Sequence, residues 1–144
     1  MAAMVAAFHF IALGMGSTGI VIRARSLKAK QLKTAFFGDN LWGIAALLWI
    51  VSGLLRAFGS YEKGSTYYLQ QPFFWVKMLL FTAIVLLEIW PMVRLIQARI
   101  RQEERLSDLL FQRFALISYL QLTLLVGMVF MASLMARGIQ PTGL

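Results

Sequence analysis

The chain has 144 residues, of which 60% are apolar and only 14% are charged, whereas soluble domains average about 45–50% apolar and about 25% charged residues. This composition excludes an ordinary soluble protein, and the length is that of a single domain, residues 1–144. The absence of cysteine excludes disulfides, thiolate metal sites, iron–sulfur clusters and a cysteine nucleophile. The net charge of +8 would favour nucleic acid as the partner of a soluble protein. Here the basic residues gather between apolar blocks, so we expect a lipid bilayer and no nucleic acid as partner.

Four apolar blocks predict four membrane-spanning helices. A hydrocarbon core about 30 Å thick needs roughly 20 helical residues to cross it. In chain order, we expect spans at about residues 3–22, 41–58, 73–95 and 108–136. A backbone in lipid must satisfy its own hydrogen bonds, so the predicted fold is all-α, an integral membrane four-helix bundle.

The first two spans have different end signals. No basic segment precedes the first span and a basic cluster follows it. This order is the reverse of a cleavable signal peptide, so we expect the span to stay in the protein. The second span is expected to start after Asp39 and Asn40, either of which is a good N-cap, and to end near Gly59.

The last two spans start with clear helix signals. The third is expected to begin at Pro72, because proline is favoured in a first helical turn, and to kink at Pro91. The fourth is expected to begin at Ser107 and Asp108, a good capping pair, and to be closed by the residues from Gly138 onward, which include Pro141.

Lysine and arginine predict the orientation of the bundle. The stretches around the first and third connections hold ten of the fourteen basic residues. By the positive-inside rule these connections face the cytoplasm, and both termini face outside. In the third connection, Arg99 and Glu103 have helical spacing and are expected to pair in a solvated helical hairpin.

Three cationic or titratable side chains lie within the spans at similar depth on the outer side: His9, Arg56 and Lys77. Such groups are costly in lipid and usually face the bundle interior. His9 fits either a hydrogen-bonded core residue or a ligand or proton role. Arg56 lies on the same predicted helix face as Trp42 and Trp49. It either snorkels to the interface or binds a carboxylate through two hydrogen bonds from its planar guanidinium. Lys77 either snorkels or needs an anionic partner.

Glu88 is the carboxylate that cannot reach an interface. It shares a helix face with Lys77 but lies about 16 Å deeper. We therefore expect Glu88 to be neutral, paired with Arg23 or Arg94, or part of a proton path. Arg23 and Asp39 are expected to join it in relaying protons or bracing the core.

Small residues and methionines complete the set of candidate residues. Small residues allow close approach of a neighbouring helix or of a flat ligand, and the candidates are Gly16, Gly19, Gly43 and Gly53. The fourth span carries Met128, Met131 and Met135. Their thioethers fit core packing, an axial haem ligand or a Cu(I) contact.

A set of motifs runs through the middle of the chain: Gly38-Asp39, Trp42-Gly43, Ser52-Gly53, Arg56, Tyr67-Tyr68, Pro72, Trp75, Lys77 and Trp90-Pro91. With them the chain resembles a bacterial family of four-helix inner-membrane proteins of unassigned function. That family is distantly similar to the HemJ-type protoporphyrinogen oxidases, four-helix membrane proteins that bind haem b and tend to be oligomeric. The resemblance implies a multi-pass protein of the bacterial inner membrane, in which the outside-facing termini given by the positive-inside rule are periplasmic.

The resemblance also implies roles for single residues. His9 matches the haem-linked histidine of the oxidases, Lys77 their third-helix lysine and Gly53 a second-helix glycine. The chain departs from them at two positions, because no histidine follows the first span and Glu88 replaces a third-helix histidine.

Two main hypotheses follow. In the first, the protein binds haem b or a porphyrin and is redox-active or acts as a tetrapyrrole oxidase. His9 is then the iron ligand, and Arg56 and Lys77 hold the propionates. The sixth iron position is empty, taken by a methionine, or taken by His9 of a second copy, which predicts a homo-oligomer. In the second, the protein is a non-enzymatic accessory or assembly subunit of a larger membrane complex. Passage of an ion or copper is a third reading.

Overall fold

The computed structural model describes residues 1–59 and 69–137. Within them the chain forms four α-helices and no strand: α1 (Ala2–Lys28), α2 (Leu32–Phe58), α4 (Pro72–Ile100) and α5 (Asp108–Ala136). Each of the four is long and apolar enough to cross a membrane. The predicted all-α membrane bundle is confirmed. Gly138 and Pro141, expected to close the last helix, lie outside the described residues.

The start of α2 differs from the prediction. α2 begins at Leu32, so Asp39 lies inside the helix and does not cap it. The chain reverses sharply after α1, because Lys30 adopts a left-handed φ of 58° and the N–H of Gln31 donates to the carbonyl of Ser26 at 2.8 Å. This is the Schellman arrangement that ends many helices, usually with glycine at the left-handed position. The early turns of α2 are stabilised by burial, since Leu32 and Ala35 are 5% and 0% exposed.

The starts of α4 and α5 agree with the prediction. Pro72 is the first residue of α4, and the hydroxyl of Ser107 accepts a hydrogen bond from the N–H of Leu110 at the start of α5. α4 continues as a helix through the buried Pro91.

The expected pairing of Arg99 with Glu103 is wrong. α4 ends at Ile100, and Gln102 turns the chain with a left-handed φ of 52°. Glu103 is thereby folded back onto Arg94, whose two terminal nitrogens donate to its carboxylate at 3.1 and 2.7 Å. Arg99 instead donates to the side-chain oxygen of Asn40 on α2 at 2.7 Å.

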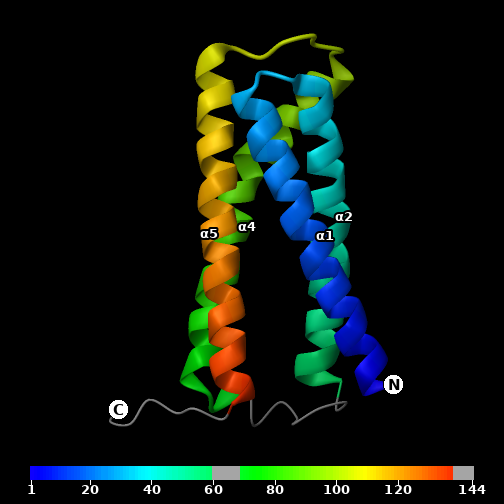
Figure 1. Cartoon of the computed structure of the whole chain (residues 1–144), viewed down its shortest axis with the longest axis vertical. Coiled ribbons are helices and arrows are strands. Elements are labelled where there is room, and N and C mark those ends of the chain that lie inside the picture. The colour runs from blue at the N-terminus through cyan, green and yellow to red at the C-terminus, as the bar shows by residue number, and fades with distance from the viewer. Residues whose placement is uncertain (60–68, 138–144) are drawn as a thin grey trace.

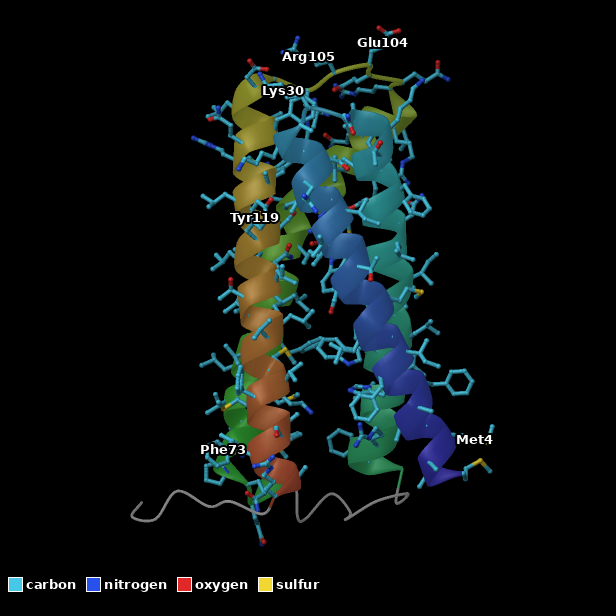
Figure 2. All side chains as sticks on the ribbon, in the orientation of Figure 1. Met4, Lys30, Phe73, Glu104, Arg105 and Tyr119 are labelled. Atoms are coloured by element: carbon cyan, nitrogen blue, oxygen red, sulfur yellow. The ribbon has the colours of Figure 1, made fainter. Side chains whose placement is uncertain are left out.

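The helices pack as two pairs. α1 packs along α2, α5 lies against both α1 and α4, and no comparable interface joins α2 to α4 within the described residues. The pairs α1–α2 and α4–α5 lie close together at one end and diverge toward the other (Figure 1). We call these the basic end, which carries Lys30 and Arg105, and the open end, which carries Met4 and Phe73 (Figure 2).

Glycines explain why α1 and α2 pack so closely. A Cβ atom at Gly19 would lie 2.7 Å from the backbone nitrogen of Trp42, and one at Gly38 would lie 2.6 Å from the backbone nitrogen of Arg23. A Cβ at Gly16 would lie 3.2 Å from the Trp42 ring. Gly43, expected among the packing glycines, instead faces outward, and a Cβ there would meet no described atom within 4 Å.

Candidate functional site

A buried arginine joins all four helices near the middle of the bundle. The side chain of Arg23 on α1 is 0% exposed. Its terminal nitrogens donate to the two carboxylate oxygens of Glu88 on α4 at 2.6 and 2.8 Å, and one of them also donates to Asp39 on α2 at 2.9 Å. Of the two partners that the sequence left open for Glu88, the structure pairs it with Arg23 and turns Arg94 toward Glu103.

Two polar side chains of α5 complete this arginine cluster. Arg23 donates through Nε to the hydroxyl of Ser118 at 3.1 Å and through Nη2 to Gln121 Oε1 at 2.8 Å. The amide nitrogen of Gln121 donates to Glu88 at 2.7 Å and to the carbonyl of Ile84 at 3.2 Å. All five N–H donors of the guanidinium therefore have acceptors, which is the condition for burying such a charge.

The arginine cluster is also close to neutral in charge. Asp39 and Glu88 supply two carboxylates to Arg23, and Arg99 lies 3.6 Å from the second oxygen of Asp39. Arg99 is 39% exposed, so a line of charged groups runs from the basic end to the middle of the bundle. A cluster that is hydrogen-bonded throughout and balanced in charge braces the two helix pairs against each other.

A cavity of about 110 Å³ lies between α2 and α4, with one wall residue from α1 and one from α5. Its lining is mostly apolar and includes His9, Trp49, Gly53, Lys77, Phe81 and Met128. The structure thus brings His9 and Lys77 into one cavity. Arg56, grouped with them from the sequence, does not line it, and its guanidinium carbon lies 5.8 Å from the centre of the Phe10 ring.

His9 is held against α2. Its Nδ1 atom lies 2.9 Å from the hydroxyl oxygen of Ser52, and its ring centre lies 5.5 Å from that of Trp49 at an interplanar angle of 31°. A Cβ at Gly53 would lie 3.4 Å from His9 Cε1. The glycine therefore leaves room for the imidazole beside the backbone of α2.

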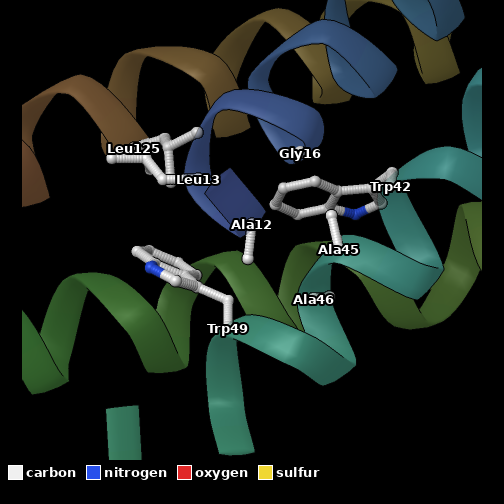
Figure 3. Close-up of a pocket in the computed structure, with 8 residues that line it drawn as sticks. All are labelled: Ala12, Leu13, Gly16, Trp42, Ala45, Ala46, Trp49 and Leu125. Atoms are coloured by element: carbon white, nitrogen blue, oxygen red, sulfur yellow. The ribbon is translucent and has the colours of Figure 1, made fainter. Parts of the chain in front are cut away.

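The tryptophans of α2 pack against small residues. Figure 3 shows Trp42 and Trp49 on either side of a gap bordered by Ala12, Gly16 and Ala45. That gap has no room for a water molecule, so the helices pack directly against one another at this level. Within the described residues, the indole nitrogen of Trp49 is buried without a hydrogen-bond partner.

The donor atoms limit which metals the site could hold. The described residues contain no group of three His, Cys, Asp or Glu side chains that could hold a metal ion. His9 brings one imidazole to the cavity, and Met78 and Met128 bring one thioether each, whereas Met131 and Met135 do not line it. Imidazole and thioether are both axial ligands of haem iron.

The sequence did not point to three residues that take part in these sites: Ser52, which contacts His9, and Ser118 and Gln121, which accept hydrogen bonds from Arg23. Ser118 and Gln121 are three residues apart, on one face of the fourth predicted span. A search for uncharged polar residues inside the predicted spans would have found them, because such groups need hydrogen-bond partners in lipid.

Four long apolar helices around a buried arginine–carboxylate cluster define a multi-pass α-helical membrane protein. The chain belongs to the DUF2214 family, described as predicted membrane proteins, whose family model matches residues 1–140. No curated protein and no solved structure matches the chain.

Proposed function

We propose that the protein binds a tetrapyrrole, haem b or a porphyrin, in the cavity between α2 and α4. The observation that carries this proposal is that His9 and Lys77, far apart in the sequence, line one mostly apolar cavity. An imidazole is a common axial ligand of haem iron. An ammonium group pairs with a propionate, and the rings of Trp49 and Phe81 offer flat apolar surfaces.

The donor groups of the cavity fit a tetrapyrrole, but the cavity is smaller than such a ligand requires. Pockets for drug-sized ligands have volumes of about 300–1,000 Å³, and this cavity has about 110 Å³. A whole tetrapyrrole therefore requires α2 and α4 to move apart. At the open end such a movement breaks few contacts, because these two helices share little interface within the described residues, and the contacts of Arg99 with Asn40 and Asp39 lie toward the basic end.

The residues of the chain then have distinct tasks. His9 would hold the iron through its imidazole, and Met78 on α4 or Met128 on α5 would be the candidate for a second iron ligand within the chain, with His9 of a second copy as the alternative. Lys77 holds a propionate. Arg56 does not line the cavity and therefore has no part in this role. The ligand supplies one-electron chemistry when bound. The arginine cluster is separate from this set and holds the helix pairs together.

The same proposal includes an orientation in the bacterial inner membrane. The two basic connections lie at one end of the bundle (Figure 2), and the positive-inside rule assigns this end to the cytoplasm. The cavity then lies in the periplasmic half of the bilayer.

A visible spectrum tests the proposal directly. The protein, purified in mild detergent and incubated with protohaem, is expected to show a Soret band that shifts on reduction. His9→Ala should abolish the band, and Phe8→Ala should keep it, because Phe8 is an exposed neighbour on the same helix, 60% exposed. A wild-type protein that folds and stays colourless would overturn the proposal.

A second candidate, an accessory subunit of a membrane complex, is favoured by the outward glycines. A Cβ at Gly14 or Gly43 would meet no described atom within 4 Å, and small residues on outward faces allow close approach of another membrane helix. Gly43→Leu should then reduce the size of the native complex in mild detergent, while Ile44→Leu should not. Equal sizes for both variants would argue against this candidate.

A further inference from the structure

The hydroxyl of Ser52 lies among three polar atoms. It is 2.7 Å from the carbonyl oxygen of Leu48, 3.2 Å from the carbonyl oxygen of Trp49 and 2.9 Å from Nδ1 of His9. A hydroxyl has one hydrogen to donate, and a carbonyl oxygen can only accept. The shortest of these contacts therefore takes the serine hydrogen, and what Ser52 offers to His9 is a lone pair.

An imidazole nitrogen that faces a lone pair must carry a hydrogen. Because the two ring nitrogens of a neutral histidine divide the roles of donor and acceptor between them, a hydrogen on Nδ1 leaves the lone pair on Nε2. In water the opposite tautomer, with the hydrogen on Nε2, prevails. The geometry around Ser52 thus selects the less common form of the ring.

We propose that Ser52 is a positioning residue that holds His9 in the Nδ1–H tautomer and so makes Nε2 its metal-binding nitrogen. The second half of this proposal rests on the proposed haem function. The first half is a property of the protein alone. Residues that hydrogen-bond the far nitrogen of a metal-binding histidine set its tautomer and its orientation, and Ser52 has this relation to His9.

The surroundings of the ring support a fixed orientation. Trp49 packs against His9 at a ring-centre distance of 5.5 Å, and the Phe10 ring contacts it edge-on at a ring-centre distance of 6.5 Å. The hydroxyl of Ser52 is anchored to its own helix through Leu48. The acceptor that faces His9 is therefore held in place by the backbone of α2.

Nitrogen NMR tests the tautomer without any ligand. The chain has one histidine, so ¹⁵N-histidine labelling reports on His9 alone. In detergent, at a pH where the spectrum shows a neutral ring, we expect the protonated nitrogen to be Nδ1. Ser52→Ala should shift the population toward Nε2–H, and Ser52→Thr, which keeps the hydroxyl, should restore the original pattern. Ser17→Ala is the matched control, because the Ser17 hydroxyl donates to the carbonyl of Leu13 on its own helix at 2.8 Å.

Protohaem titration of the same variants separates the two halves of the proposal. Loss of the partner of a metal-binding histidine typically lowers metal affinity by about 10–100-fold, and we expect this for Ser52→Ala and not for Ser52→Thr. An Nε2–H ring in the wild-type protein would overturn the inference, even if Ser52→Ala failed to fold. An Nδ1–H ring in a protein that binds no haem would instead refute the proposed function and leave the tautomer assignment standing.

Discussion

The guanidinium fork of Arg23 and the carboxylate of Glu88 face each other with two hydrogen bonds, 2.6 and 2.8 Å long, across 65 positions of sequence. This bidentate contact joins α1 to α4, which belong to different helix pairs. Bidentate arginine–carboxylate contacts are among the stronger and more directional hydrogen-bond arrangements in proteins. The arginine cluster therefore holds the basic half of the bundle together, while the open half contains the cavity.

Glu88→Gln is expected to destabilise the protein strongly. Glutamine is neutral and has one acceptor oxygen in place of two, so the buried Arg23 would keep Asp39 as its carboxylate partner but lose an acceptor. Leaving a buried donor of a charged group unsatisfied typically costs about 1–3 kcal/mol or more. Glu103→Gln is the matched control, because Glu103 makes the same bidentate contact with Arg94 where both side chains are about a quarter exposed. Thermal unfolding in detergent should show a much larger fall in midpoint for Glu88→Gln. Equal shifts in the two variants would show that the arginine cluster does not brace the bundle.

Gly38→Ala is expected to disrupt the packing of α1 on α2. The added Cβ would meet the backbone nitrogen of Arg23 at 2.6 Å, and backbone atoms cannot give way as a flexible side chain does. Overpacking of this kind typically costs about 1–3 kcal/mol. Gly14→Ala, where the new methyl meets no described atom within 4 Å, should instead stabilise α1 by up to about 1 kcal/mol through helix propensity. The unfolding midpoints of the two variants should move in opposite directions.

Gln102→Gly is expected to stabilise the protein. Gln102 has a φ of 52°, a left-handed conformation that costs a residue with a Cβ about 1–2 kcal/mol and glycine almost nothing. Arg101→Gly is the control, because Arg101 has a φ of −80° and gains no relief of strain. A rise in unfolding midpoint for Gln102→Gly alone would support the left-handed conformation of Gln102 after α4, and a fall would contradict it.

Lys77→Met is expected to weaken binding of protohaem about tenfold or more, because a hydrogen bond to a charged group contributes about 1.5–3 kcal/mol. The loss should disappear with the dimethyl ester of protohaem, which has no free propionate. Arg56→Met should affect neither titration, since Arg56 lies outside the cavity lining. If Lys77→Met weakened both ligands equally, its role would lie in the shape of the cavity and not in pairing with a propionate.

The predicted elements that proved correct depend on local physics. The membrane spans follow from block length and the need of a backbone in lipid for internal hydrogen bonds. The starts at Pro72 and Ser107 follow from the chemistry of a single helical turn. The start of α2 was missed because its first turns are stabilised by burial of Leu32 and Ala35 against other helices, a contribution that no local signal carries.

Which of the charged side chains come together could not be predicted from the sequence, and only the tertiary structure decided it. From sequence, Glu88 had Arg23 and Arg94 as equal candidates, and Arg56 had the same claim as Lys77 to a shared site. Those choices depend on how far each helix is rotated about its axis, and the close contact of Gly19 and Gly38 between α1 and α2 helps to set that rotation. Hydropathy and spacing alone thus determined a four-helix membrane protein with charged groups in its interior. Which of those groups meet was decided by helix packing, because side chains distant in sequence become neighbours only once the backbones have docked.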